Sequence, residues 1–211
     1  FSDIVDPIKK YKFYEFAHRL QILDTSTPYP LLLYLSGLHN DELSTHEKDM
    51  IAQDLESYLI RRFVCGLTQK NYNHIFLYLL KEAKKAQKQN KNIHKVIREC
   101  LINLKGDTSR WPRNSEFLKN WKTRKLYFKT RPDRAKILLH ALEKYGRTCR
   151  SEHYLPKVSD LTIEHLLPQQ ANTDLYPYGY NIDIQEGETL ENIRTQFVDT
   201  IGNLTLLTQS L

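Results

Sequence analysis

Two short segments near the C-terminus of this chain contain residues suited to catalysis or metal binding. Residues 163–169 (IEHLLPQ) place an acid, Glu164, directly before His165, followed by two apolar residues and a proline. Residues 202–207 (GNLTLL) place Asn203 in a run rich in branched residues. Neighbouring residues of a strand point to opposite faces, so Glu164 and His165 cannot both lie in a core. At least one of them faces solvent, a ligand or a metal.

Each segment on its own has a more ordinary interpretation. A Glu-His pair in a strand is more often a surface pair, and a Gly-Asn-Leu run is more often a turn. The chemistry is nevertheless suitable for catalysis. An imidazole with its ordinary pKa near 6.5 can act as a general base at neutral pH. A carboxylate is a hard oxygen ligand of the kind that Mg²⁺ and Mn²⁺ prefer.

Taken together and in this order, the two segments resemble the HNH (His-Asn-His) nucleases. More narrowly, residues 163–169 with residues 200–208 are similar to the C-terminal nuclease region of GmrSD-like modification-dependent restriction enzymes. Residues 58–67 (YLIRRFVCGL) and the Trp111-Pro112 pair are similar to the helical region that precedes it. The resemblance implies an α+β fold, in which a mostly helical body carries a small ββα-metal motif.

The resemblance also implies a role for each residue of the site. His165 would be the general base, Glu164 a ligand of a divalent metal ion (Mg²⁺ or Mn²⁺), and Asn203 the residue that holds the hairpin and orients His165 through an amide hydrogen bond. Family members carry a further Asn or His ligand, which is expected beyond Leu211, so the motif is expected to be truncated at its final helix. The expected partners are DNA and an NTPase-like half, in the same protein or in a partner subunit.

Periodicity and capping signals predict the helices and strands that surround these residues. Residues 8–146 are expected to be helical almost throughout, with a capping box at residues 44–47 and a helix bracketed by Pro132 and Gly146. Residues 158–167 and 201–207 are expected to be short strands, with a helix at 190–198 and a polar loop at 169–190. The expected domains are a helical, basic, DNA-docking domain at 1–150 and the nuclease domain at 151–211.

The charge distribution is the second indication of function. The net charge of +6 divides into +13 for residues 1–150 and −7 for residues 151–211. A basic body favours a polyanionic partner, although a solvated lysine-rich surface explains the same charge. Trp111 and Trp121 lie among the basic residues between positions 110 and 136, and such tryptophans are more often core anchors than stacking platforms. The residues expected to contact nucleic acid are Lys84, Lys85, Lys88, Arg124 and Lys125.

Several other classes of protein are disfavoured. No apolar run reaches the roughly 18 residues of a membrane span, and the chain begins without a signal-peptide pattern. Three separated cysteines predict reduced thiols in a cytoplasmic protein. His153 is more simply an exposed loop histidine than an extra ligand. The expected function is metal-dependent endonucleolytic hydrolysis of DNA phosphodiester bonds in a restriction or phage-defence system. The alternative is a nucleic-acid-binding or protein-docking module with a degenerate nuclease site.

Overall fold

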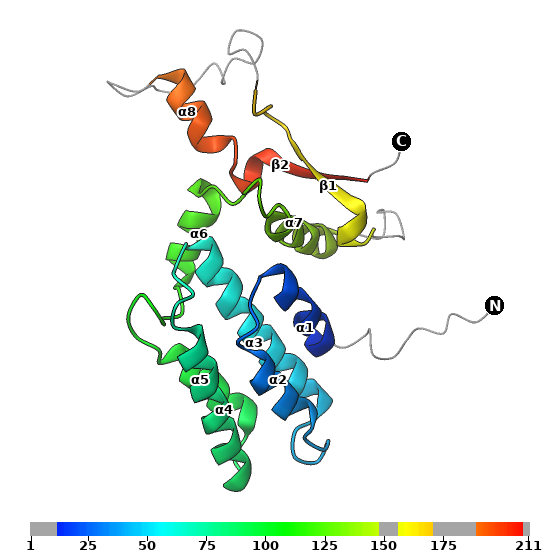
Figure 1. Ribbon diagram of the computed structural model, residues 1–211, viewed down its shortest axis with the longest axis vertical. Helices are drawn as coiled ribbons and strands as arrows, with labels where there is room; N and C mark the ends of the chain where they lie inside the picture. The colour runs from blue at the N-terminus through cyan, green and yellow to red at the C-terminus, as the bar shows by residue number, and fades with distance from the viewer. Residues whose placement is uncertain (1–11, 148–155, 171–188, 209–211) are drawn as a thin grey trace, which may run out of the picture. The chain divides into compact units, whose positions relative to one another are not determined.

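The computed structural model describes residues 12–147, 156–170 and 189–208, and the chain divides into two compact units (Figure 1). The first unit is Phe1–Phe117 and the second is Leu118–Leu211. The described residues are mostly helical and contain one two-stranded sheet, as expected for the α+β class. Among them, no helix combines the length and the apolar character needed to cross a membrane.

The first unit is built from helices packed around α3, the longest of them. The buried side chains of α3, including Ile51, Leu55 and Tyr58, recur at the helical period and contact α1 on one side and α5 on another. α4 lies beside α2 and α5 (Figure 1). The helices are α1 (Lys12–Ile22), α2 (Tyr29–Ser36), α3 (Thr45–Val64), α4 (Tyr72–Lys88), α5 (Ile93–Ile102) and α6 (Asn114–Thr123), the last of which crosses the boundary between the units.

The start of α3 follows the predicted capping box. The Ser44 side chain accepts a hydrogen bond from the Glu47 backbone N–H, and the Glu47 carboxylate accepts one from the Ser44 backbone N–H at 3.0 Å. The hydrogen bond from the Ser44 side chain is the main cause that lowers the pKa of Glu47. Bonds from the Ser44 backbone and the Asn92 side chain lower it further, whereas partial burial opposes them. After α3, Gly66 adopts φ 66°, a left-handed conformation that glycine reaches without steric cost. The predicted helix start is therefore confirmed.

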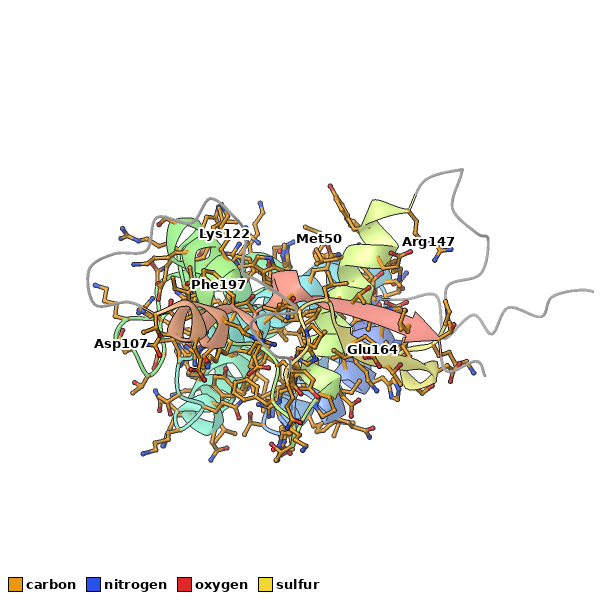
Figure 2. The ribbon with its side chains drawn as sticks, turned by 90° about the horizontal axis from the view of Figure 1, so that it is seen from above. Met50, Asp107, Lys122, Arg147, Glu164 and Phe197 are labelled. Atoms are coloured by element: carbon orange, nitrogen blue, oxygen red, sulfur yellow. The ribbon has the colours of Figure 1, made fainter. Side chains whose placement is uncertain are left out.

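In the second unit one helix packs on a strand pair, and a short helix lies between the two strands in the chain. α7 (Asp133–Gly146) begins after Pro132, as predicted, and buries Ala135, Ile137 and Leu138. It contacts both strands, and the three elements lie side by side in both views (Figure 1 and Figure 2). The remaining elements are the 3₁₀ turn η2 (Val158–Asp160), β1 (Leu161–His165), α8 (Leu190–Phe197), the 3₁₀ turn η3 (Ile201–Asn203) and β2 (Leu204–Thr208).

The strand pair is antiparallel and in a single register. Leu161 of β1 pairs with Thr208 of β2, and His165 at the end of β1 pairs with Leu204 at the start of β2. Both predicted strands are present but shorter than expected, because a 3₁₀ turn precedes each of them. The compact units divide at residue 117 because α7 packs on the strands; the functional division predicted at residue 150 stays a prediction.

Candidate active site

The two candidate residues of β1 point away from each other. Glu164 is exposed, whereas His165 lies on the face that carries the buried Leu161. The side chain of His165 has a relative exposure of 10%. The expectation that the two side chains cannot share a core is therefore confirmed, and the carboxylate is the one that faces solvent.

Two neighbours hold the His165 ring. Its Nε2 atom lies 3.3 Å from Oδ1 of Asp199, which is located between α8 and η3. The ring of Tyr127 meets the imidazole edge to face, with centroids 4.7 Å apart and planes at 88°. The imidazole is thus fixed by a carboxylate at one nitrogen and by an aromatic ring against its surface.

Asp199 connects several parts of the second unit. Its backbone carbonyl accepts hydrogen bonds from the backbone N–H groups of Leu126 (2.9 Å) and Tyr127 (3.1 Å). Its Oδ1 atom also accepts a hydrogen bond from Nε2 of Gln169 at 3.2 Å. An isolated antiparallel bridge between Lys125 and Thr200 completes the pairing. This backbone pairing brings Tyr127 to the same side of the unit as His165.

The side chain of Asn203 binds backbone groups of Leu167 and Val198 and does not bind His165. Its Oδ1 accepts the Leu167 N–H at 2.7 Å, and its Nδ2 donates to the carbonyls of Leu167 (3.1 Å) and Val198 (2.8 Å). Its backbone carbonyl also accepts the Leu166 N–H at 2.9 Å. The expected amide hydrogen bond to the His165 ring is wrong, because backbone groups use both ends of this amide. Asp199 lies at that ring nitrogen instead.

The turn after His165 is also held by α8. Arg194 is a buried residue of this helix, and its Nη2 donates a hydrogen bond to the carbonyl of Pro168. α8 itself begins at the N-cap Thr189, whose hydroxyl accepts the Asn192 N–H at 3.2 Å. The segment that follows the candidate base is therefore anchored both by Asn203 and by the helix that precedes Asp199.

The described residues supply the right kind of metal ligand but not a full set. The Glu164 carboxylate is an exposed hard oxygen donor, as Mg²⁺ or Mn²⁺ requires. Within residues 12–147, 156–170 and 189–208, no group of three or more His, Cys, Asp or Glu side chains could hold a metal ion. Any further ligands would be water molecules or residues outside these ranges. His153 and Cys149, considered in the sequence, also lie outside them.

The expected nucleic-acid contacts fall in both compact units. Lys84, Lys85 and Lys88 are exposed on α4, where Lys84 lies over the Tyr34 ring at 5.4 Å and Lys85 lies 3.7 Å from Glu82. Arg124 and Lys125 belong to the second unit; Arg124 is half-buried and Lys125 is exposed. Each cluster is thus a surface feature of its own unit.

Three other residues of types that occur in active sites, among them Trp111, have structural partners. Trp111 packs edge to face against Tyr58, with ring centroids 5.8 Å apart, as expected of a core anchor. His140 contacts the Pro156 carbonyl through Nε2 at 3.0 Å. Cys100 donates to the Tyr78 hydroxyl at 3.4 Å, which, together with burial, raises the pKa of Tyr78 to about 12. These contacts account for all three side chains without a catalytic role.

The sequence did not indicate four residues as part of the site: Tyr127, Gln169, Arg194 and Asp199. Gln169 lies in a segment that carries the resemblance, but no role followed for it or for Tyr127. Asp199 lies immediately before residues 200–208, and an acidic residue next to that segment is the one sequence feature that could have indicated its role. Its proximity to His165 depends on the turn between α8 and β2, which periodicity does not specify.

The second unit is thus an α+β unit in which a histidine at a strand end is held by an aspartate and a tyrosine. Residues 111–211 match the family model described as GmrSD restriction endonucleases, C-terminal domain. The resemblance expected from the sequence is therefore confirmed for this region, and the family suggests a restriction endonuclease type of function. No curated protein and no solved structure matches the chain significantly.

Proposed function

We propose that this chain hydrolyses DNA phosphodiester bonds as an HNH-type, divalent-metal-dependent endonuclease of a restriction or phage-defence system. The observation that carries the proposal is the held imidazole of His165 at the end of β1, in a region that matches a restriction endonuclease domain. The match supports DNA as the substrate and an N-terminal region as the partner. That this region is NTPase-like, in the same protein or in a partner subunit, is part of the proposal.

Three residues of the chain would each have a role in the reaction. His165 takes a proton from a water molecule, whose oxygen then attacks phosphorus; the bond to the leaving sugar oxygen breaks, and solvent protonates that oxygen. Asn203 keeps the turn after β1 in place through its backbone hydrogen bonds. Glu164 would bind the metal ion, which when bound neutralises charge on the phosphate.

One observation favours the alternative function. Because the described residues do not gather three metal ligands, a module that binds DNA or protein without cleaving it would need no change in this structure. The two proposals differ in a measurable way, since only a nuclease converts supercoiled plasmid to nicked circles in a metal-dependent manner.

Plasmid nicking tests the proposal directly. We expect nicking with Mg²⁺ or Mn²⁺, its loss on addition of EDTA, and a decrease of at least about tenfold in Glu164→Gln, because the neutral amide is a weaker metal ligand. Isothermal titration with Mn²⁺ should show weaker binding by the same variant.

The matched control for this experiment is Glu191→Gln, which removes an exposed carboxylate of α8 in the same unit. It should leave nicking and Mn²⁺ binding unchanged. Undiminished nicking in EDTA would exclude the metal, and nicking by neither protein would favour the docking module.

The basic residues make a separate prediction about DNA affinity. Reversing Arg124 and Lys125 to glutamate should weaken binding to a duplex and reduce the slope of log K against log salt by about 2, because two phosphate contacts no longer release counterions. Fluorescence anisotropy at several salt concentrations measures both quantities. The same substitutions at Lys84 and Lys85 test the α4 cluster.

Lys70→Glu with Lys105→Glu provides a control of equal charge change, since both lysines are exposed outside the two clusters. If this pair weakens binding as much as Arg124→Glu with Lys125→Glu, the effect is one of net charge alone. The assignment of residues 124 and 125 to a DNA contact would then be wrong.

A further inference from the structure

One residue, Asp199, determines two of the contacts made by the candidate base His165. The Asp199 carboxylate lies 3.3 Å from Nε2 of His165, and the Asp199 backbone carbonyl accepts the N–H of Tyr127, whose ring packs against the same imidazole. Two contacts to His165, one polar and one aromatic, therefore depend on the position of Asp199.

We propose that Asp199 is the positioning residue of the site: it holds His165 with Nε2–H toward its carboxylate and so leaves Nδ1 as the atom that accepts the proton from water. This inference rests on the proposed function for its consequence in catalysis. The orientation of the ring is a property of the folded chain, and it can be measured whether or not the chain cleaves DNA.

The chemistry of the two groups selects the tautomer. A neutral imidazole has one N–H donor and one acceptor nitrogen, whereas an ionised carboxylate only accepts. The favourable contact therefore places the hydrogen on Nε2, opposite Oδ1 of Asp199. Within the described residues, no hydrogen bond to Nδ1 of His165 is made. The lone pair of that nitrogen thus stays available, as a general base requires.

The carboxylate is itself fixed, which a positioning group requires. Gln169 donates to the same Oδ1 atom, and the backbone N–H groups of Leu126 and Tyr127 hold the Asp199 carbonyl. The Asp199 side chain has a relative exposure of 24%, and that of His165 has 10%, so water competes only partly for the contact. Removing this carboxylate should free the ring without removing the backbone pairing.

The decisive measurement is the exchange of the His165 ring proton. In a ¹⁵N–¹H correlation spectrum recorded well above the ordinary imidazole pKa of about 6.5, the chain should show a protected proton on Nε2. In Asp199→Ala this proton should exchange faster by about tenfold or more. In Asp199→Asn, whose amide oxygen can still accept, exchange should be intermediate.

Asp160→Asn is the matched control, because Asp160 is an exposed aspartate adjoining the other end of β1 and bonds only locally to Ser159 at 2.7 Å. It should leave the Nε2 proton unchanged. A protected proton on Nδ1, or exchange that Asp199→Ala does not alter, would overturn the inference.

Nicking kinetics provide the functional measurement. Asp199→Ala should lower kcat by about 10–100-fold with KM and the unfolding midpoint little changed, and Asp199→Asn should recover part of the loss. Equal losses in both variants, explained by a lower unfolding midpoint, would make Asp199 merely structural and overturn its positioning role. If the wild-type chain does not nick DNA, the proposed function fails, and the proton-exchange result alone decides the inference.

Discussion

Replacing His165 by alanine should reduce DNA nicking by about 10²–10⁴-fold, the usual effect of removing a general base. The imidazole is the group that the second unit holds at the end of β1, with the Asp199 carboxylate at Nε2 and the Tyr127 ring against it. The substitution should leave Mn²⁺ binding largely intact, because the proposed ligand, Glu164, lies on the opposite face of the strand. Single-turnover nicking and calorimetric titration measure the two effects separately.

His74→Ala is a suitable control, since His74 is an exposed histidine of α4 in the other unit. It should nick DNA like the wild type. The His165 variant also loses a hydrogen bond of about 1 kcal/mol, so its unfolding midpoint is needed to separate lost chemistry from lost structure. A fully folded His165→Ala protein that nicks normally would show that another group takes the proton.

The helical part of the fold could be predicted because its signals are local. The capping box at Ser44 and Glu47 specifies the start of α3, and Pro132 specifies the start of α7, through interactions within a few residues. α8 was expected at residues 190–198 and spans Leu190–Phe197. Side chains satisfy backbone groups at the starts of α3 and α8, and the fixed φ of Pro132 favours the start of α7.

The strand ends were less predictable because side chains compete there with the sheet. Ser159 donates to the Asp160 carboxylate at 2.7 Å, and residues 158–160 form a turn where a strand was expected. Before β2, Asn203 binds the Val198 carbonyl, which favours the turn at residues 201–203. Branched residues alone predict extended structure in both places, whereas these polar contacts favour turns.

The two motif segments of the candidate site could be found from sequence, but not the surroundings of His165. Glu164, His165 and Asn203 stand out by residue type and order. Tyr127 reaches His165 through pairing between residues 125–127 and 199–200, which are far apart in the chain, and Asp199 reaches it through the turn between α8 and β2. Such pairing has no sequence period, so it emerges only when the fold is known.

The second large effect expected concerns stability of the first unit. Arg62 lies at a core position of α3, with no exposed surface, and donates to four backbone carbonyls at 2.7–3.2 Å. These carbonyls belong to Thr68, Asp107, Thr108 and Arg110. Its guanidinium also lies 5.5 Å from the ring centroids of Tyr58 and Tyr72. The guanidinium of Arg62 thus supplies hydrogen-bond donors to backbone carbonyls of residues 107–110 and links this segment to α3.

Arg62 has no salt bridge to an acidic side chain among the described residues, so its charge is balanced by carbonyl dipoles and aromatic faces. Arg62 shares the buried face of α3 with Leu55, Tyr58 and Leu59, where an arginine is unusual. A planar guanidinium explains the choice, because its several donors can reach carbonyls in different directions at once. A lysine at this position would keep the charge but could not reproduce that geometry.

Arg62→Ala should therefore lower the free energy of unfolding by on the order of 4 kcal/mol, because it opens a cavity and leaves several buried carbonyls without donors. Arg61→Ala is the matched control. Arg61 is half-buried and contacts the Pro112 carbonyl at 3.3 Å and the Phe117 ring at 5.0 Å, so its loss should cost about 1 kcal/mol. Urea unfolding followed by tryptophan fluorescence is informative here, since Trp111 packs on Tyr58 beside Arg62. Equal unfolding midpoints for the two variants would show that the carbonyl contacts of Arg62 contribute little to stability.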